Sequence, residues 1–158
     1  MNNWFYINLA TFLLAVIFFL WNLPKTGTIL LASILGLLGL LFILFNWNMH
    51  AIFSKIRQLK KRSDRIKIAK YARKIMPYHM MIGICGLILI IGHLFFVFYS
   101  YGIFINLKIL SGILAFIGLI IVSISGYLRR VKASRLRRLF HLYSSFVLFI
   151  LIVFHLIV

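Results

Sequence analysis

Four histidines within two apolar stretches are the residues of this sequence best suited to chemistry. His79 and His93 lie in one stretch, His141 and His155 lie in a later one, and each pair is separated by fourteen positions. On an α-helix, fourteen steps return to within about 40° of the same face and rise about 21 Å. Ionisable residues inside apolar membrane segments are rare and mark functional sites. The spacing therefore predicts two helices that each present two imidazoles to a shared ligand.

The composition places these stretches in a membrane protein. The 158-residue chain is 64% hydrophobic and 12% charged, with a mean hydropathy of +1.09, whereas soluble domains are about half apolar and about a quarter charged. A net charge of +17 would indicate nucleic-acid binding in a soluble protein. Here the basic residues lie between the apolar stretches, which favours the positive-inside rule and contact with anionic lipid. We expect a multi-pass membrane protein that contacts membrane lipid and no nucleic acid.

Five apolar segments are long enough to cross a membrane as helices. Pro77 is expected in the first turn of the third segment, where its missing N–H has no helical partner. The first segment lacks a basic region before it and a small-residue cleavage site after it, so we interpret it as a retained span. The predicted fold is an all-α integral membrane protein with one domain, residues 1–158, folded as a five-span transmembrane helical bundle with spans at about 4–23, 28–47, 78–100, 107–128 and 139–158.

Two basic loops orient these spans. Ten of the 18 Lys and Arg residues lie in 48–77 and six lie in 129–138, which leaves Lys25 and Lys108 for the other side. The positive-inside rule therefore predicts a cytoplasmic N-terminus, two cytoplasmic basic loops and a C-terminus outside. Apolar residues recur at near-helical spacing within 48–77, so part of this loop is expected to lie on the membrane as an amphipathic helix.

With this topology the third and fifth spans run in the same direction and pair their histidines by depth. His79 and His141 are expected near the cytoplasmic face, and His93 and His155 near the outer face. Two facing neutral imidazoles are the usual axial ligands of a low-spin b-type haem. Zinc or copper would require three or four ligands with carboxylate or thiolate among them, and the spans contain no Asp or Glu. The sequence therefore predicts two b-type haems about 20 Å apart along the membrane normal.

Small and basic residues near the histidines match a flat, anionic cofactor. Gly83 and Gly86 share the histidine face of the third span and are expected to pack against haem, with ordinary small-residue helix packing as the alternative. Arg138 and Lys108 are candidate contacts for the propionates of the inner and the outer haem, with solvated loop charge as the alternative. No second histidine lies fourteen residues from His50, and we interpret His50 as an interfacial residue without a haem.

The histidine pattern resembles a known family. Histidine pairs on the third and fifth helices look like those of the ferric reductase and NADPH oxidase transmembrane domain. The run SGYLRR, Ser125 to Arg130, followed by RLRRLFHLYSSFVLFILIVFH, is similar to bacterial members and their small di-haem cytochrome relatives. The resemblance covers spans three to five, and it implies His79 and His141 as inner-haem ligands and His93 and His155 as outer-haem ligands.

The family also implies a source and a destination for electrons. Its oxidases and reductases typically add a sixth span and a cytoplasmic flavin and nicotinamide domain, and this sequence contains no glycine-rich nucleotide motif. We therefore expect a separate cytoplasmic NAD(P)H-oxidising flavoprotein, or a quinol, as the donor, and an extracytoplasmic electron acceptor. No catalytic residue is predicted in this chain.

Three functions are open on the sequence. The first is a ferric reductase-like di-haem cytochrome that moves electrons across the membrane. The second is a quinone-linked cytochrome b subunit that anchors a larger oxidoreductase. The third is a haem-free membrane scaffold or transporter subunit whose histidines hold helices together through hydrogen bonds.

Overall fold

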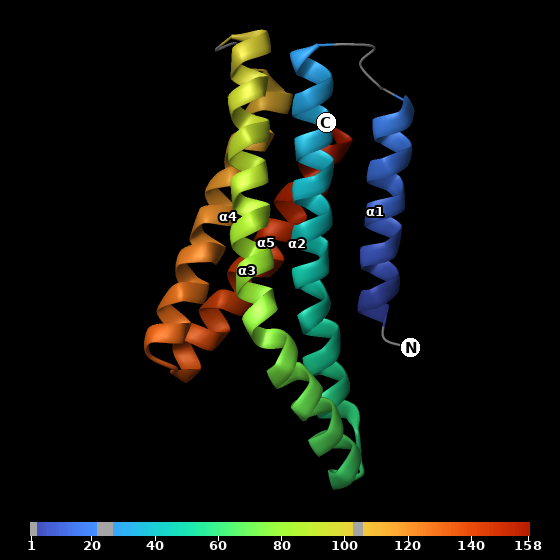
Figure 1. The fold of residues 1–158 in the computed structure, drawn as a ribbon, viewed down its shortest axis with the longest axis vertical. Helices are drawn as coiled ribbons and strands as arrows, with labels where there is room; N and C mark the ends of the chain where they lie inside the picture. The colour runs from blue at the N-terminus through green and yellow to red at the C-terminus, as the bar shows by residue number, and fades with distance from the viewer. Residues whose placement is uncertain (1–2, 22–26, 103–105) are drawn as a thin grey trace. The chain divides into compact units, whose positions relative to one another are not determined.

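The computed structural model describes residues 3–21, 27–102 and 106–158, except for the side chains of residues 4 and 5. These residues form five helices and no strand, which confirms the all-α class (Figure 1). Four helices are long and apolar enough to cross a membrane, which confirms a membrane protein, whereas α1 offers the shorter apolar stretch Tyr6–Trp21. The fifth span and the orientation of the termini therefore stay predictions. The helices are α1 (Asn3–Trp21), α2 (Thr28–Gln58), α3 (Arg62–Tyr101), α4 (Leu107–Val131) and α5 (Arg135–Ile157).

Helix contacts divide the chain into two compact units, Met1–Ser100 and Tyr101–Val158. In the first unit, α2 and α3 form an antiparallel hairpin. At the end opposite the turn, a 2.6 Å hydrogen bond joins Thr28 Oγ1 to Ser100 Oγ. Helix α1 packs on α2, where Asn8 Nδ2 donates to Asn48 Oδ1 at 3.0 Å. In the second unit, α4 and α5 form another antiparallel hairpin. One bundle of five spans remains an expectation from the sequence.

The segments predicted as basic loops are mostly helical. Helix α2 continues to Gln58 and α3 begins at Arg62, so residues 59–61 alone connect them. Residues 132–134 connect α4 and α5 in the same way. Lys and Arg are good helix formers, and residues 48–76 contain no Gly or Pro that would end a helix. Most of 48–77 therefore consists of the end of α2 and the start of α3 rather than of a loop, and an amphipathic helix on the cytoplasmic membrane surface stays a prediction.

The predicted position of Pro77 in a first turn is wrong, because this residue lies inside α3. A proline inside a helix removes one backbone hydrogen bond and clashes with the preceding turn, which bends the helix. Figure 1 shows α3 changing direction between its green first part and its yellow-green second part. Helix α3 ends where Gly102 adopts a left-handed conformation, with φ of 69°. His79 and His93 both follow the proline, on the apolar part of the helix.

The α4–α5 hairpin packs through a seven-residue repeat. Ser145, Leu148 and Ile152 are buried on α5, and the two histidines extend this series in alternating steps of four and three residues. The buried Ser111, Ala115, Gly118 and Ser125 follow the same spacing on α4. Such a repeat keeps one face of a helix against its partner when the pair supercoils. Because fourteen residues are two such repeats, both histidines of α5 face α4.

Candidate functional site

The α4–α5 hairpin holds its two histidines by the same arrangement. The distance between His141 Nδ1 and Ser125 Oγ is 2.8 Å, and that between His155 Nδ1 and Ser111 Oγ is 3.0 Å. All four residues are buried or half-buried, and each serine side chain is 1% exposed. Each imidazole of α5 is therefore tied to a hydroxyl of α4 away from water.

The serine protons decide the direction of these hydrogen bonds. Ser125 Oγ donates to the Val122 carbonyl at 2.7 Å, and Ser111 Oγ donates to the Lys108 carbonyl at 2.8 Å. A hydroxyl has a single proton, so a serine that donates it to its carbonyl accepts from its histidine. In this arrangement the Nδ1 atoms of both histidines carry the proton, and the lone pair of each neutral ring is on Nε2. Metal-ligating histidines commonly use this arrangement, with one ring N–H held by an acceptor and the other nitrogen on the metal.

A glycine of α4 faces each of these rings. A Cβ atom added to Gly126 would lie 3.3 Å from His141 Cε1, and one added to Gly112 would lie 3.0 Å from His155 Cε1. These spaces are tighter than ordinary carbon contacts, so each ring occupies the room that a side chain would need. Neither the serines nor these glycines are among the residues expected from the sequence. The signal that indicates them is a Ser–Gly step that occurs twice on α4 with the same fourteen-residue spacing as the histidines.

His93 on α3 is held in the same way by a different acceptor. Its Nδ1 lies 2.7 Å from the carbonyl oxygen of Ala32 on α2. A carbonyl only accepts hydrogen bonds, so Nδ1 carries the proton here too. Gly36 lies one helical turn after Ala32, where a side chain would point back over that carbonyl. A Cβ atom on Gly36 would lie 2.8 Å from His93 Nδ1, which explains how the ring reaches the backbone of α2.

The surroundings of His79 differ from those of His93. A Cβ atom on Gly83 would lie 3.0 Å from Asn46 Nδ2, and this contact sets the register of the two helices near His79. In that register the position on α2 fourteen residues after Gly36 is His50, at the level of His79. Asn46 Oδ1 is buried there and makes no hydrogen bond to the described residues. On α2 the position that corresponds to the facing glycine by this spacing is therefore a histidine.

Each pair of histidines spaced by fourteen residues lies on one continuous helix, as expected. His79 and His93 are on α3 in the first unit, and His141 and His155 are on α5 in the second. Pairing of α3 histidines with α5 histidines stays a prediction. The described residues contain no group of three or more His, Cys, Asp or Glu side chains suited to a metal ion.

The remaining predicted contacts have structural roles of their own. Gly83 and Gly86 both face α2, and a Cβ atom on Gly86 would lie 3.3 Å from Phe42 Cβ. Helix packing therefore accounts for both glycines, and their contact with haem stays a prediction. Lys108 Nζ donates to the carbonyl of His155 at 2.6 Å, near the end of α5. Arg138 is exposed in the first turns of α5. The contacts of these two cations with propionates also remain predictions.

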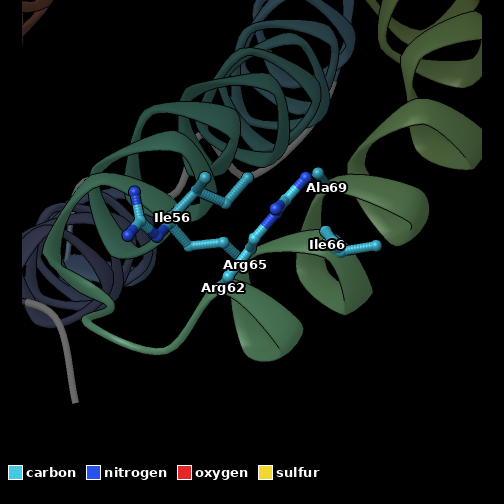
Figure 2. A pocket seen from close by; sticks show the side chains of 5 residues that line it. All are labelled: Ile56, Arg62, Arg65, Ile66 and Ala69. Carbon is cyan, nitrogen blue, oxygen red and sulfur yellow. The ribbon is translucent and has the colours of Figure 1, made fainter.

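A surface hollow of about 390 Å³ lies beside the basic turn between α2 and α3. Figure 2 shows the guanidinium groups of Arg62 and Arg65 at this hollow together with apolar side chains. Arg65 Nη2 donates to the Lys60 carbonyl at 3.1 Å, which holds one arginine against the turn. The combination of cations and apolar surface suits an anionic partner. The lining residues are Ile56, Arg62, Arg65, Ile66 and Ala69.

Fold and site together define a class of protein: an all-α membrane protein built from helical hairpins whose second helix carries two histidines. Comparison of the chain with protein-family models, with curated proteins and with solved structures gives no match. The ferric reductase-like identity stays a prediction.

Proposed function

We propose that this chain is a di-haem b-type cytochrome, similar to the membrane domain of ferric reductases, that moves electrons across a bacterial plasma membrane. The observation that supports this most is the state of three histidines. The Nδ1 atoms of His93, His141 and His155 each lie within hydrogen-bond distance of an oxygen on the neighbouring helix, beside a glycine. Each ring is thereby held in the tautomer whose Nε2 can ligate iron.

The chain's own residues would hold the haems and set their surroundings. His79 with His141 would ligate the inner haem, and His93 with His155 the outer one, as the predicted topology requires. Bound between two imidazoles, each haem supplies one-electron transfer between ferric and ferrous iron. The apolar side chains around the histidines would exclude water from both sites.

The basic turns would serve the electron donor. Arg62 and Arg65 line the hollow beside the α2–α3 turn, and six more cations surround the α4–α5 turn. A cytoplasmic flavoprotein with an acidic surface would be attracted to these charges. A quinol is the alternative donor, and an extracytoplasmic acceptor would receive the electrons.

A haem-free scaffold is the second candidate, because a specific observation favours it. The hydrogen bonds of His141 and His155 join α4 to α5, and that of His93 joins α2 to α3. Interhelical hydrogen bonds of this kind stabilise membrane helix pairs by about 1 kcal/mol each without any cofactor. The two candidates predict the same contacts and differ in whether Nε2 binds iron.

The deciding measurement is a dithionite-reduced minus oxidised absorption spectrum of the purified protein, with haem counted per polypeptide. The proposal expects a low-spin b-type spectrum and two haems per chain. A ratio near one with all four histidines present would exclude the transmembrane relay. A folded protein that neither contains haem nor binds added haemin would support the scaffold.

A further inference from the structure

Ser111 and Ser125 differ from the other serine of α4 in what their hydroxyls contact. Ser123 Oγ donates to the Leu119 carbonyl at 2.8 Å, the usual behaviour of a serine inside a membrane helix. Ser111 and Ser125 also donate to a backbone carbonyl, but each has an imidazole on its second side. Only these two take part in the fourteen-residue match between α4 and α5.

We infer that Ser111 and Ser125 are positioning residues for two haem ligands, His155 and His141, an inference that rests on the proposed function. Donation to the helix backbone orients each Oγ, so its lone pair is aimed at the imidazole before any ligand arrives. The hydrogen bond then holds the proton on Nδ1 and limits rotation of the ring. An acceptor at this nitrogen also makes the imidazole a stronger electron donor to a metal.

Burial makes the two serines effective in this role. Each is 1% exposed, so water does not compete with the hydroxyl for the ring N–H. Loss of such a partner beyond the ligands typically weakens metal binding by about 10- to 100-fold. We therefore expect Ser125→Ala to weaken the inner haem by about this factor and Ser111→Ala to weaken the outer haem, each without effect on the other site.

The first test needs no haem. In haem-free protein with ¹⁵N-labelled histidine in lipid nanodiscs, nitrogen chemical shifts report which ring atom carries the proton. His141 and His155 are expected as Nδ1–H tautomers in the wild type. In Ser125→Ala the His141 signals alone should move toward a mixture of tautomers, and Ser123→Ala should change neither histidine.

The second test adds haemin to the same variants and measures affinity and the reduction potential of each site. Ser125→Ala and Ser111→Ala should each weaken one site and raise its potential, while Ser125→Thr, which keeps a hydroxyl, should restore most of the affinity. Ser123→Ala is the control for the loss of a half-buried hydroxyl on the same helix.

The outcomes separate the inference from the proposed function. If His141 keeps its Nδ1 proton and its haem affinity in Ser125→Ala, the freed Val122 carbonyl suffices and the serine is not a positioning residue. A wild-type Nε2–H tautomer at either histidine would overturn the inference directly. If the wild type binds no haemin although both tautomers are as expected, the proposed function fails, and the haem role of the serines fails with it.

Discussion

The α2–α3 and α4–α5 hairpins use a common design with different acceptors. In both, the second helix carries two histidines fourteen residues apart, and the first helix supplies an acceptor and a glycine. In the α4–α5 hairpin the acceptors are the hydroxyls of Ser111 and Ser125. In the α2–α3 hairpin, Leu35 precedes the glycine, and the ring of His93 reaches the backbone carbonyl of Ala32 instead. A serine hydroxyl in one hairpin and a backbone carbonyl in the other can therefore both hold the proton of a histidine on Nδ1.

The two hairpins also differ in regularity. Both histidines of α5 face a Ser–Gly step, so the α4–α5 hairpin repeats one arrangement at two levels. On α2 the glycine that faces His93 has no counterpart fourteen residues later, where the sequence has His50, and the side chain of Asn46 faces Gly83. The two levels of the first unit are therefore unlike, and substitutions there should have unequal effects.

The largest effect is expected from removal of a ligand, which tests how the hairpins combine. His79→Ala and His141→Ala should each abolish the same haem, and His93→Ala and His155→Ala should each abolish the other, so that every variant retains one of two haems. Difference spectra and haem counts measure this directly. Loss of the same spectral component in His79→Ala and His155→Ala would contradict the parallel third and fifth spans.

The next largest effect is expected from substitution of the glycines that face the histidine rings. These glycines differ in how close an added Cβ would lie to the ring. Gly36→Ala would place a Cβ 2.8 Å from the ring of His93, Gly112→Ala 3.0 Å from His155, and Gly126→Ala 3.3 Å from His141. Overpacking of this kind destabilises by about 1–3 kcal/mol. We expect the greatest haem loss and destabilisation in Gly36→Ala, less in Gly112→Ala and least in Gly126→Ala. Haem retention during thermal unfolding measures both effects.

Gly92→Ala is the control for these glycines, because its Cβ would meet only the methyl end of a leucine, at 3.3 Å. This side chain can move aside, so both haems should remain. Equal loss of haem in all four alanine variants would show that the clearances at the rings do not matter.

The turns of the two hairpins provide a third comparison. Reversal of Lys60 and Lys61 to Glu in one turn, or of Arg135 and Arg138 to Glu in the other, should slow haem reduction by a cytoplasmic flavoprotein by about tenfold, because steering by charge is lost. Haem content should not change, and added salt should slow the wild type in the same way. The measurement is stopped-flow reduction at several salt concentrations.

Equal rates in wild type and variants at all salt concentrations, with full reduction by a quinol analogue alone, would contradict a flavoprotein donor. The quinone-linked anchor would then become the better proposal. A difference between the two turns would identify the hairpin on which the donor binds.

The smallest effect is expected for His50→Ala. The ring of His50 contacts Trp47 with centroids 4.7 Å apart, so a loss of about 1 kcal/mol of stability is expected from packing. Both haems should remain, which haem counting checks. Loss of the haem that also disappears in His79→Ala would instead show that His50 supports the inner site.

Much of the fold follows from local properties of the sequence. Apolar segments of about 20 residues predict spanning helices because every backbone group must find a partner within the helix. The histidine spacing on α3 and α5 is likewise visible, since it needs only an unbroken helix. The extent of the helices is less predictable: helix continues through the basic segments, and Pro77 lies within α3, where it bends the helix rather than starting it.

Apolar helices and two pairs of equally spaced histidines can be predicted from the sequence alone, because helix length and residue spacing are properties of a single segment. The partners of those histidines depended on the tertiary structure, because the register of one helix against another decides which carbonyl or hydroxyl meets a ring. The Ser–Gly steps of α4 are visible in the sequence because they repeat at the same fourteen-residue spacing as the histidines. The Ala32 carbonyl leaves no such signal, because every residue has a carbonyl and only the approach of His93 over Gly36 makes this one an acceptor.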